Sequence, residues 1–187
     1  GAFFWEERNH WFSDVWFDLI GTTQKLNNNA TRLRSAAFPF ELSYRLINMY
    51  SLKGDTVVDP FLGTGTTTAA AMAAGRHCIG FEIESGFREE ILAIKDTIVE
   101  TSNDRIHRRI KSHLDFVKKR SQERGHLKYL NRHYKFPVMT RQEIELGEEF
   151  RILYGENTEM PFEIRISIFF SQTDFRFGET AVFFRFG

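Results

Sequence analysis

Cysteine is nearly absent from this sequence of 187 residues, since Cys78 is the only one. A single cysteine excludes an internal disulfide and a zinc site built from cysteines, and it is typical of a reducing cytoplasm, where we expect the protein. No apolar run reaches the length of about eighteen residues that suggests a membrane-spanning helix. The first residues lack the pattern of a signal peptide. They also lack an initiator methionine, which suggests a longer parent chain.

An excess of charge of one sign is lacking too, because 25 Lys and Arg residues balance 25 Asp and Glu residues. The charges are nevertheless uneven, since residues 105–135 hold eleven Lys or Arg and only two acids. Such a strip is typical of contact with a phosphate backbone, but a solvated helix face with mobile lysines explains it equally well. The candidate phosphate contacts are Arg105, Arg108, Arg109, Lys111, Lys118, Lys119 and Arg120.

The hydrophobic pattern predicts an α/β fold in three parts. Residues 1–37 form an aromatic lead-in of strand and loop, whose rings we expect mainly in the core. Residues 38–145 form a cofactor-binding α/β domain with a basic helical region at 105–135. Residues 146–187 form a Phe-rich β tail whose role no motif explains.

Local signals give the elements at the centre of the chain. Apolar residues at helical spacing after Pro39 predict an amphipathic helix of about three turns. The β-branched segment 56–58 predicts a buried parallel strand, and residues 77–82 predict a second strand. Between the two strands, the small residues at 66–74 predict a helix that ends at Gly75. These elements together predict a parallel sheet flanked by helices.

The later part of the chain is less regular. We expect a helix from about residue 84 and a second helix in the basic region. Alternation of apolar and polar residues at 162–168 predicts a strand, and residues 181–186 predict another. The tail should therefore be rich in β structure.

The segment Asp59-Pro60-Phe61-Leu62-Gly63-Thr64-Gly65-Thr66-Thr67 joins the first strand to the helix. Gly63 and Gly65 let the backbone approach a ligand, and the helix that follows has a partly positive N-terminus. Glu82, at the end of the next strand, is placed to accept hydrogen bonds from both hydroxyls of a ribose. These features predict a pocket for a nucleotide cofactor, although two glycines also occur in tight α/β turns that bind nothing.

Three classes of cofactor compete for this loop. A P-loop needs a lysine after the second glycine, where this chain has Thr66, so an ordinary NTPase is excluded. A dinucleotide fold has a third glycine where this chain has Thr68, which disfavours a pyrophosphate. S-adenosylmethionine has no phosphate, and its ammonium and sulfonium suit the carboxylate of Asp59. S-adenosylmethionine therefore fits best.

Four motifs resemble those of the DNA methyltransferases that methylate adenine N6 or cytosine N4. Asp59-Pro-Phe-Leu-Gly-Thr-Gly-Thr-Thr is similar to their cofactor motif, and Gly80-Phe-Glu-Ile-Glu is similar to the motif whose first acid holds the ribose. Phe38-Pro-Phe-Glu-Leu-Ser-Tyr-Arg-Leu-Ile resembles the helix before the cofactor motif, and Ser13-Asp-Val-Trp resembles a segment upstream of that helix. The resemblance covers roughly residues 5–95.

The resemblance implies a partial Rossmann-like methyltransferase fold, S-adenosylmethionine as cofactor and double-stranded DNA as partner, within a restriction–modification system. It implies that Glu82 binds the ribose and that the helix after Phe38 closes over the methionine end of the cofactor. It also implies that Phe61 lies beside the adenine or the methionine. It also makes the basic strip a candidate DNA contact. The implied cofactor-binding residues are Phe38, Pro39, Glu41, Asp59, Pro60, Phe61, Gly63, Gly65, Thr66, Thr67 and Glu82.

The catalytic tetrapeptide of that family contains two adjacent prolines, and here Pro39, Pro60, Pro137 and Pro161 all stand apart. In the family this tetrapeptide holds the target amino group and stacks on the flipped base. The order of the motifs places it before residue 1. We therefore expect the cofactor-binding C-terminal half of a methyltransferase, inactive alone, whose catalytic motif lies on a missing N-terminal half or on a separate chain.

Two other interpretations stay open. The chain could be a non-catalytic, DNA-binding remnant of such an enzyme, or a fragment of a Rossmann-like oxidoreductase, which Thr68 disfavours. We expect no catalytic residue in this chain, because the tetrapeptide is absent. We expect no metal site, because His107 and His113 do not share a helix face. The resemblance leans towards cytosine N4 as the target, and adenine N6 stays possible.

Overall fold

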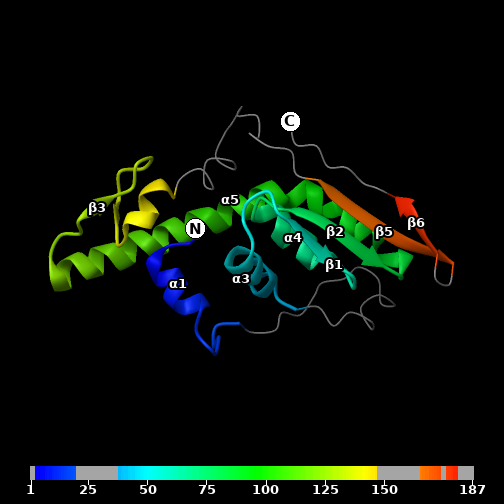
Figure 1. The fold of residues 1–187 in the computed structure, drawn as a ribbon, viewed down its shortest axis with the longest axis horizontal. Helices are drawn as coiled ribbons and strands as arrows, with labels where there is room; N and C mark the ends of the chain where they lie inside the picture. The colour runs from blue at the N-terminus through cyan, green and yellow to red at the C-terminus, as the bar shows by residue number, and fades with distance from the viewer. Residues whose placement is uncertain (1–2, 20–37, 147–164, 174–175, 181–187) are drawn as a thin grey trace. The chain divides into compact units, whose positions relative to one another are not determined.

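The computed structural model describes residues 3–19, 38–146, 165–173 and 176–180, with side chains up to Phe170. The chain divides into two compact units (Figure 1). The sheet unit comprises Phe17–Ile98 and Met160–Gly187, and the helical unit comprises Gly1–Trp16 and Val99–Glu159. None of the helices in the described ranges is both long enough and apolar enough to cross a membrane.

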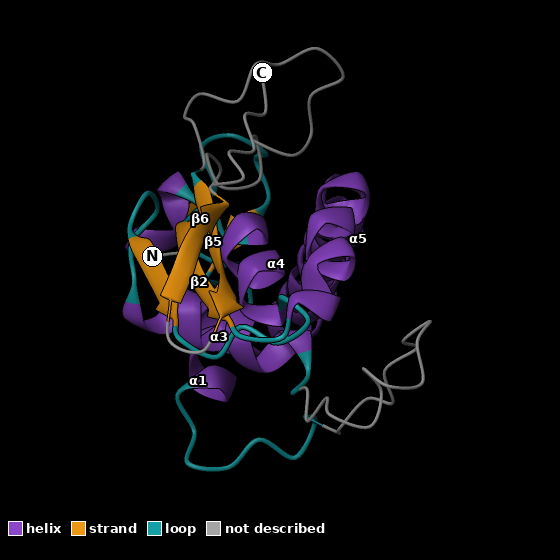
Figure 2. Cartoon of the chain, turned by 90° about the vertical axis from the view of Figure 1, so that its right-hand side faces the viewer, coloured by secondary structure: helices purple, strands orange, loops and turns teal. Residues whose placement is uncertain are grey.

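The sheet unit is built on four strands in the order β1-β2-β5-β6. Strands β1 (Thr56–Asp59), β2 (His77–Glu82) and β5 (Ile166–Thr173) run parallel, and β6 (Arg176–Thr180) pairs with β5 in the antiparallel direction. Figure 2 shows β2, β5 and β6 side by side, with helix α4 (Thr66–Ala73) beside the sheet. The predicted α/β fold with a parallel, Rossmann-like sheet is thereby confirmed.

Two helices of the sheet unit begin and end as the sequence predicts. Helix α3 (Phe40–Tyr50) follows Pro39, whose φ of −61° suits the start of a helix. Helix α4 starts after Gly65 and is followed by Gly75, which has a φ of 71°. Small buried residues of α4, among them Ala70 and Ala71, let the helix approach the sheet closely.

Strand β1 runs parallel to β2 as predicted, but it is not buried. The side chain of Val58 is 58% exposed. Among the described strands β1 stands at one edge of the sheet and pairs with β2 alone. A β-branched run predicts a strand but not its place in the sheet, so the prediction of burial was wrong. The open side of β1 is part of the pocket described below.

A single helix, α5 (Arg88–Arg124, 37 residues), replaces the two helices predicted after residue 84, and a short 3₁₀ turn, η1 (Ser85–Phe87), precedes it. No glycine or proline interrupts this stretch, so nothing ends the helix early. The helix stops before Gly125, whose φ is 84°. The predicted basic helical region at 105–135 is therefore helical only as far as Arg124.

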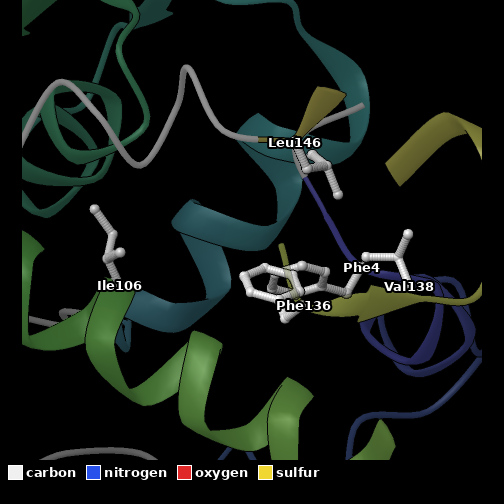
Figure 3. Close-up of a cluster of buried hydrophobic side chains, with 5 residues drawn as sticks. All are labelled: Phe4, Ile106, Phe136, Val138 and Leu146. Carbon is white, nitrogen blue, oxygen red and sulfur yellow. The ribbon is translucent and has the colours of Figure 1, made fainter. Parts of the chain in front are cut away.

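The helical unit combines helix α1 (Trp5–Trp11) with the part of α5 from Val99 onward. A short hairpin of β3 (Tyr129–Leu130) and β4 (Pro137–Val138) and a 3₁₀ turn, η2 (Arg141–Glu145), complete it. Its core gathers buried side chains from all these parts of the chain (Figure 3): Phe4, Ile106, Phe136, Val138 and Leu146. The start of the lead-in thus packs with residues far away in the sequence, and the predicted three parts of the chain do not correspond to this grouping.

Helix α1 stands where the alternating aromatic residues predicted strand or loop, so that prediction was wrong. The carboxylate of Glu7 accepts a hydrogen bond from the backbone N–H of Phe4 at 2.8 Å, which satisfies a donor at the helix start. Phe4, which directly precedes the helix, and Trp11, its last residue, are both buried. Phe17, expected in the core, is instead 88% exposed.

The tail supplies strands to the central sheet, a role that its sequence does not reveal. Strand β5 begins four residues later than the start of the predicted strand at 162–168 and pairs in parallel with β2. The backbone N–H of Arg165 donates to Nδ1 of His77 at 2.8 Å, which links the two strands and gives His77 a structural role. The predicted strand at 181–186 lies outside the described residues.

Candidate functional site

The loop between β1 and α4 is held by the main chain of β2. The backbone N–H of Leu62 donates to the carbonyl of Phe81 at 2.9 Å, and that of Gly65 donates to the carbonyl of Leu62 at 3.1 Å. Gly63 and Gly65 have φ values of 57° and 85°, in the left-handed region that residues with a Cβ rarely adopt. The loop shape therefore requires glycine at both positions.

The two glycines differ in their surroundings. A Cβ at Gly65 would lie 2.7 Å from Cδ1 of Ile94 and 3.3 Å from Cγ1 of Ile91, two side chains at the start of α5. A Cβ at Gly63 would meet no atom within 4 Å. Gly65 therefore permits close packing of the loop on the helix, whereas Gly63 leaves open space beside the backbone that a ligand can approach.

Glu82, at the end of β2, fixes the loop through its carboxylate. Its Oε2 accepts a hydrogen bond from the N–H of Gly63 at 2.6 Å, and its Oε1 accepts one from the N–H of Glu84 at 2.7 Å. The residue is only 8% exposed. The structure thus places this predicted acid directly at the glycine loop, where it also orders the backbone that follows β2.

A pocket of about 280 Å³ opens between α3, β1 and α4. It is lined by Phe38, Leu42, Ser43, Leu46, Ile47, Val58, Asp59 and Thr67. Most of this lining is apolar, with one carboxylate and two hydroxyl groups among it. Such a combination of apolar walls and few polar groups is typical of small-molecule sites.

The pocket brings together three of the predicted cofactor-binding residues: Phe38, Asp59 and Thr67. Asp59 also accepts a hydrogen bond on Oδ1 from the N–H of Phe61 at 2.9 Å, which fixes the turn after β1. The residues that the prediction missed lie mainly on α3. Leu42, Leu46 and Ile47 formed the apolar stripe of the predicted helix. The spacing predicted only an amphipathic helix and did not single out these side chains, which line the pocket.

Other predicted residues lie on the same elements but do not line the pocket. Glu41 accepts a hydrogen bond on Oε1 from Nε of Arg45 at 2.7 Å, and Arg45 also pairs with Asp18. Burial lowers the pKa of the Arg45 guanidinium, but its hydrogen bonds to the two carboxylates outweigh this effect and raise that pKa. Pro39 starts α3, and Thr66 starts α4.

Pro60 and Phe61 are exposed at the tip of the loop, with 87% of Phe61 accessible to solvent. A large apolar side chain with this exposure is unusual on a loop whose backbone is otherwise fixed by hydrogen bonds. Phe61 is therefore available to a ligand that extends beyond the pocket.

Cys78, in the middle of β2, is buried beside Thr68, with 3.5 Å between Sγ and Oγ1. Burial raises the pKa of its thiol to about 11, while the contact with Thr68 lowers it and the charge of Asp59 raises it further. The thiol is therefore protonated near neutral pH and is neither a nucleophile nor a metal ligand there.

Cys78 should make the fold sensitive to alkaline pH. Its folded pKa of about 11 lies above its ordinary value of 9.0, so the unfolded chain releases the proton first as the pH rises. Its contribution of about 2 to 3 kcal/mol is present below pH 9 and is lost between about pH 9 and pH 11. Urea unfolding at pH 8 and pH 10.5 checks this loss. The Cys78→Ala variant should lose less stability over that interval, and an equal loss in both proteins contradicts the assignment.

The seven predicted phosphate contacts all lie on α5 in the helical unit, but they differ in exposure. Arg108, Lys111, Lys118 and Lys119 are exposed, whereas Arg105, Arg109 and Arg120 are partly buried. Arg109 makes a two-pronged ion pair with Glu7, with Nε–Oε1 at 2.6 Å and Nη2–Oε2 at 2.7 Å. Arg109 therefore joins α5 to α1, and its fork is directed at a carboxylate of the protein itself.

A polar cluster that the sequence did not suggest lies beside this ion pair. Glu6, His113 and Glu143 bring ligand-type atoms within 4.8 Å of one another, a geometry that could hold a metal ion. Hydrogen bonds already use these atoms, since Nδ1 of His113 contacts Glu6 at 2.7 Å and its Nε2 contacts the carbonyl of Pro137 at 3.0 Å. Glu143 accepts hydrogen bonds from the backbone of Trp5 and Thr140. The cluster links α1, α5 and the segment after β4.

Comparison with known proteins gives consistent matches. Residues 3–95 match a family model described as DNA methylase. The chain is 50% identical over 162 residues to the type II methyltransferase M.MthZI of Methanothermobacter thermautotrophicus. The alignment covers 87% of this chain and 44% of that protein. It is 46% identical over 93 residues to the type II methyltransferase M.MjaI of Methanocaldococcus jannaschii, in an alignment that covers 48% of this chain and 30% of that protein.

A solved structure from Thermus thermophilus, described as a provisional DNA modification methylase, aligns with a TM-score of 0.38 and 36% identity, over 46% of this chain and 32% of that one. The chain spans less than half the length of each curated relative named above.

Proposed function

This chain belongs to the family of DNA methyltransferases that methylate adenine N6 or cytosine N4, and from that membership we propose that its sheet unit binds S-adenosylmethionine. The observation that carries the proposal is the mainly apolar pocket between α3, β1 and α4, beside a glycine loop that Glu82 holds in place. Its volume of about 280 Å³ is close to the lower bound of about 300 Å³ for small-molecule pockets, so it suits one end of the cofactor.

The methionine end suits the pocket best. Asp59 is the one carboxylate in the lining, and it would stabilise the ammonium of the methionine moiety through charge-assisted hydrogen bonds. The apolar side chains of α3 and Phe38 would pack on the methylene groups. Thr66 and Thr67, at the start of α4, offer hydroxyl groups and helix N–H groups to the carboxylate of the methionine moiety.

The nucleoside end would then lie at Glu82 and the loop tip. Each carboxylate oxygen of Glu82 accepts one backbone hydrogen bond and keeps a second lone pair. The same carboxylate can therefore hold the loop and accept hydrogen bonds from ribose hydroxyls. The open space beside Gly63 allows a ligand to come close to the backbone. The exposed ring of Phe61 offers a stacking surface for the adenine.

S-adenosylmethionine, when bound, would supply an electrophilic methyl group on its sulfonium, with the thioether of S-adenosylhomocysteine as the leaving group. Residues of this chain would bind and orient it, but the sequence holds no adjacent prolines and so lacks the motif that presents the target amine. We assign that motif to another segment of the parent protein or to a separate chain. The methyl acceptor would be cytosine N4 or adenine N6 at a specific DNA site.

The isolated chain should therefore transfer no methyl group. Incubation with methyl-labelled S-adenosylmethionine and unmethylated duplex DNA is expected to leave the DNA label at the level of a protein-free blank. Label retained by the chain itself on a filter would show that cofactor binding survives in the same sample. Labelling of the DNA that increases with time and with chain concentration contradicts the assignment of this chain to the cofactor-binding half.

The DNA partner is proposed from the charges of α5. Arg108, Lys111, Lys118 and Lys119 are exposed along this helix. None of them makes an ion pair within the described part of the chain, so each can bind a phosphate oxygen without breaking one there. Arg109 is assigned instead to the packing of the helical unit, because its guanidinium already binds Glu7. The proposed contact predicts DNA binding that weakens steeply as salt increases.

A further inference from the structure

The turn between β3 and β4, residues 131–136, presents four consecutive exposed side chains: Arg132, His133, Tyr134 and Lys135. Arginine and lysine are the usual partners of nucleic-acid phosphates, and aromatic rings pack on sugars and bases. Arg132 and Lys135 belong to the basic strip at 105–135, but none of these four residues is among the seven candidate phosphate contacts named from the sequence. We call this segment the β3–β4 turn.

The β3–β4 turn is held in one conformation by a buried asparagine. Asn131 is fully buried, and its Oδ1 accepts hydrogen bonds from the N–H groups of His133 at 3.0 Å and Tyr134 at 2.9 Å. Its Nδ2 donates to the carbonyls of Glu143 at 3.1 Å and Leu146 at 2.6 Å. One side chain thus shapes the turn and ties it to the segment after β4, so the exposed side chains start from a fixed backbone.

The base of the turn is also anchored in the core of the helical unit. Phe136 belongs to the buried cluster, and its ring stacks on that of Tyr134 with centroids 5.9 Å apart and an interplanar angle of 4°. The carbonyl of Pro137 contacts His113 of α5 at 3.0 Å. The turn is therefore a rigid projection from the helical unit, and a rigid element loses little conformational entropy when it binds.

Lys135 has a φ of 60°, and it is the one residue other than glycine with positive φ in the described ranges. Glycine or asparagine adopts this conformation at lower cost than lysine. Residues held in such sparsely populated conformations concentrate at functional sites. A lysine that costs folding free energy at an exposed position suggests that its charge serves a partner rather than the fold.

The charge around the turn is strongly positive. Residues 118–135 hold seven Lys or Arg and one acid, Glu123. Arg132 pairs with Glu145 at 3.0 Å, but both side chains are more than half exposed, so the pair contributes little and a phosphate can replace the carboxylate. The turn lies outside residues 3–95, which match the family model.

We propose that the β3–β4 turn is a preformed DNA-contacting element. Lys135 and Arg132 bind backbone phosphates, and the ring of Tyr134, supported by Phe136, packs against a nucleotide between them. This inference rests on the proposed function, since it takes duplex DNA as the partner, and it adds a second contact to the one proposed for α5.

The strained lysine allows a test in which fold and function respond in opposite directions. Lys135→Gly relieves the backbone, so the chain should unfold at the same or a higher urea concentration than the wild type. Its affinity for a fluorescein-labelled duplex of mixed sequence should nevertheless fall several-fold, as measured by anisotropy. The slope of log K against log salt should decrease by about one, as expected for the loss of one phosphate contact. Arg132→Ala should reduce the slope by a similar amount.

Lys95→Ala is the matched control, because it removes the same charge from an exposed position of α5 in the sheet unit. Its affinity and salt slope should stay close to those of the wild type. If Lys95→Ala weakens binding as much as Lys135→Gly does, only net charge matters and the proposal fails. If the wild-type chain binds DNA and both turn variants keep its affinity and slope, the proposal fails while the proposed DNA partner stands. If the wild type binds no DNA at low salt, both fail.

Discussion

Replacing Gly65 with alanine is expected to lower the free energy of unfolding by about 2 to 5 kcal/mol. The left-handed φ of 85° costs a residue with a Cβ about 1 to 2 kcal/mol. The new methyl group would also lie 2.7 Å from Cδ1 of Ile94, a terminal atom that can move aside, and 3.3 Å from Cγ1 of the fully buried Ile91, which has less room to move. Overpacking of this kind typically costs about 1 to 3 kcal/mol. Single domains have about 5 to 15 kcal/mol in total, so urea unfolding should show the loss clearly.

Gly54→Ala separates the two causes. Gly54 has the same φ of 85°, but a Cβ there meets no atom within 4 Å, so this variant should lose only the conformational part, about 1 to 2 kcal/mol. Ile94→Val removes the methyl group that the Gly65→Ala side chain meets. Alanine at position 65 should therefore cost less in the Ile94→Val background than in the wild type. A loss in Gly65→Ala no larger than in Gly54→Ala contradicts the close packing of the loop on α5.

Replacing Glu82 with glutamine should weaken the binding of S-adenosylhomocysteine by about a hundredfold. The carboxylate accepts hydrogen bonds from the N–H groups of both Gly63 and Glu84, whereas a glutamine side chain has one oxygen and would turn its NH₂ group towards the other donor. The variant also loses the negative charge that would strengthen the hydrogen bonds from the ribose hydroxyls. Charge-assisted hydrogen bonds contribute about 1.5 to 3 kcal/mol each, and a hundredfold change corresponds to about 2.8 kcal/mol.

Glu84→Gln is the matched control for this measurement. Glu84 lies two residues further along, and its carboxylate accepts a weaker hydrogen bond from the N–H of Gly86 at 3.3 Å. Calorimetric titration of the two variants should give a large loss of affinity for Glu82→Gln and little change for Glu84→Gln. Equal affinities in the two variants, with both chains folded, would remove Glu82 from the proposed site.

The central part of the sheet unit could be predicted because its signals are local. Pro39 at a helix start, β-branched residues at 56–58 and Gly75 after α4 each act on the nearest few residues. The glycine loop was predicted for the same reason, since φ above zero at Gly63 and Gly65 is a property of single residues. Pocket residues on α3 were missed because one apolar stripe looks the same whether it faces a core or a cavity.

The pairing of distant segments could not be predicted from such signals. Strand β5 lies next to β2 because Cys78 and Ile166 pair across the sheet, and nothing in the alternation of the tail specifies that partner. The segment of helix α1 was predicted as strand or loop because aromatic residues favour strands, whereas the burial of Phe4 and Trp11 determines the outcome. The Asn131 network, which makes the β3–β4 turn rigid, likewise depends on carbonyls from another segment.

Titration of the isolated chain with S-adenosylhomocysteine in a calorimeter tests the central claim, that the pocket and the glycine loop bind S-adenosylmethionine. One site per chain with a dissociation constant in the micromolar range is the expected result, with no measurable heat from NADH under the same conditions. Absence of binding by a chain that circular dichroism shows to be folded would contradict the claim, and salt-sensitive DNA binding in that sample would favour a non-catalytic DNA-binding remnant. Binding of NADH in place of S-adenosylhomocysteine would assign the loop to a dinucleotide.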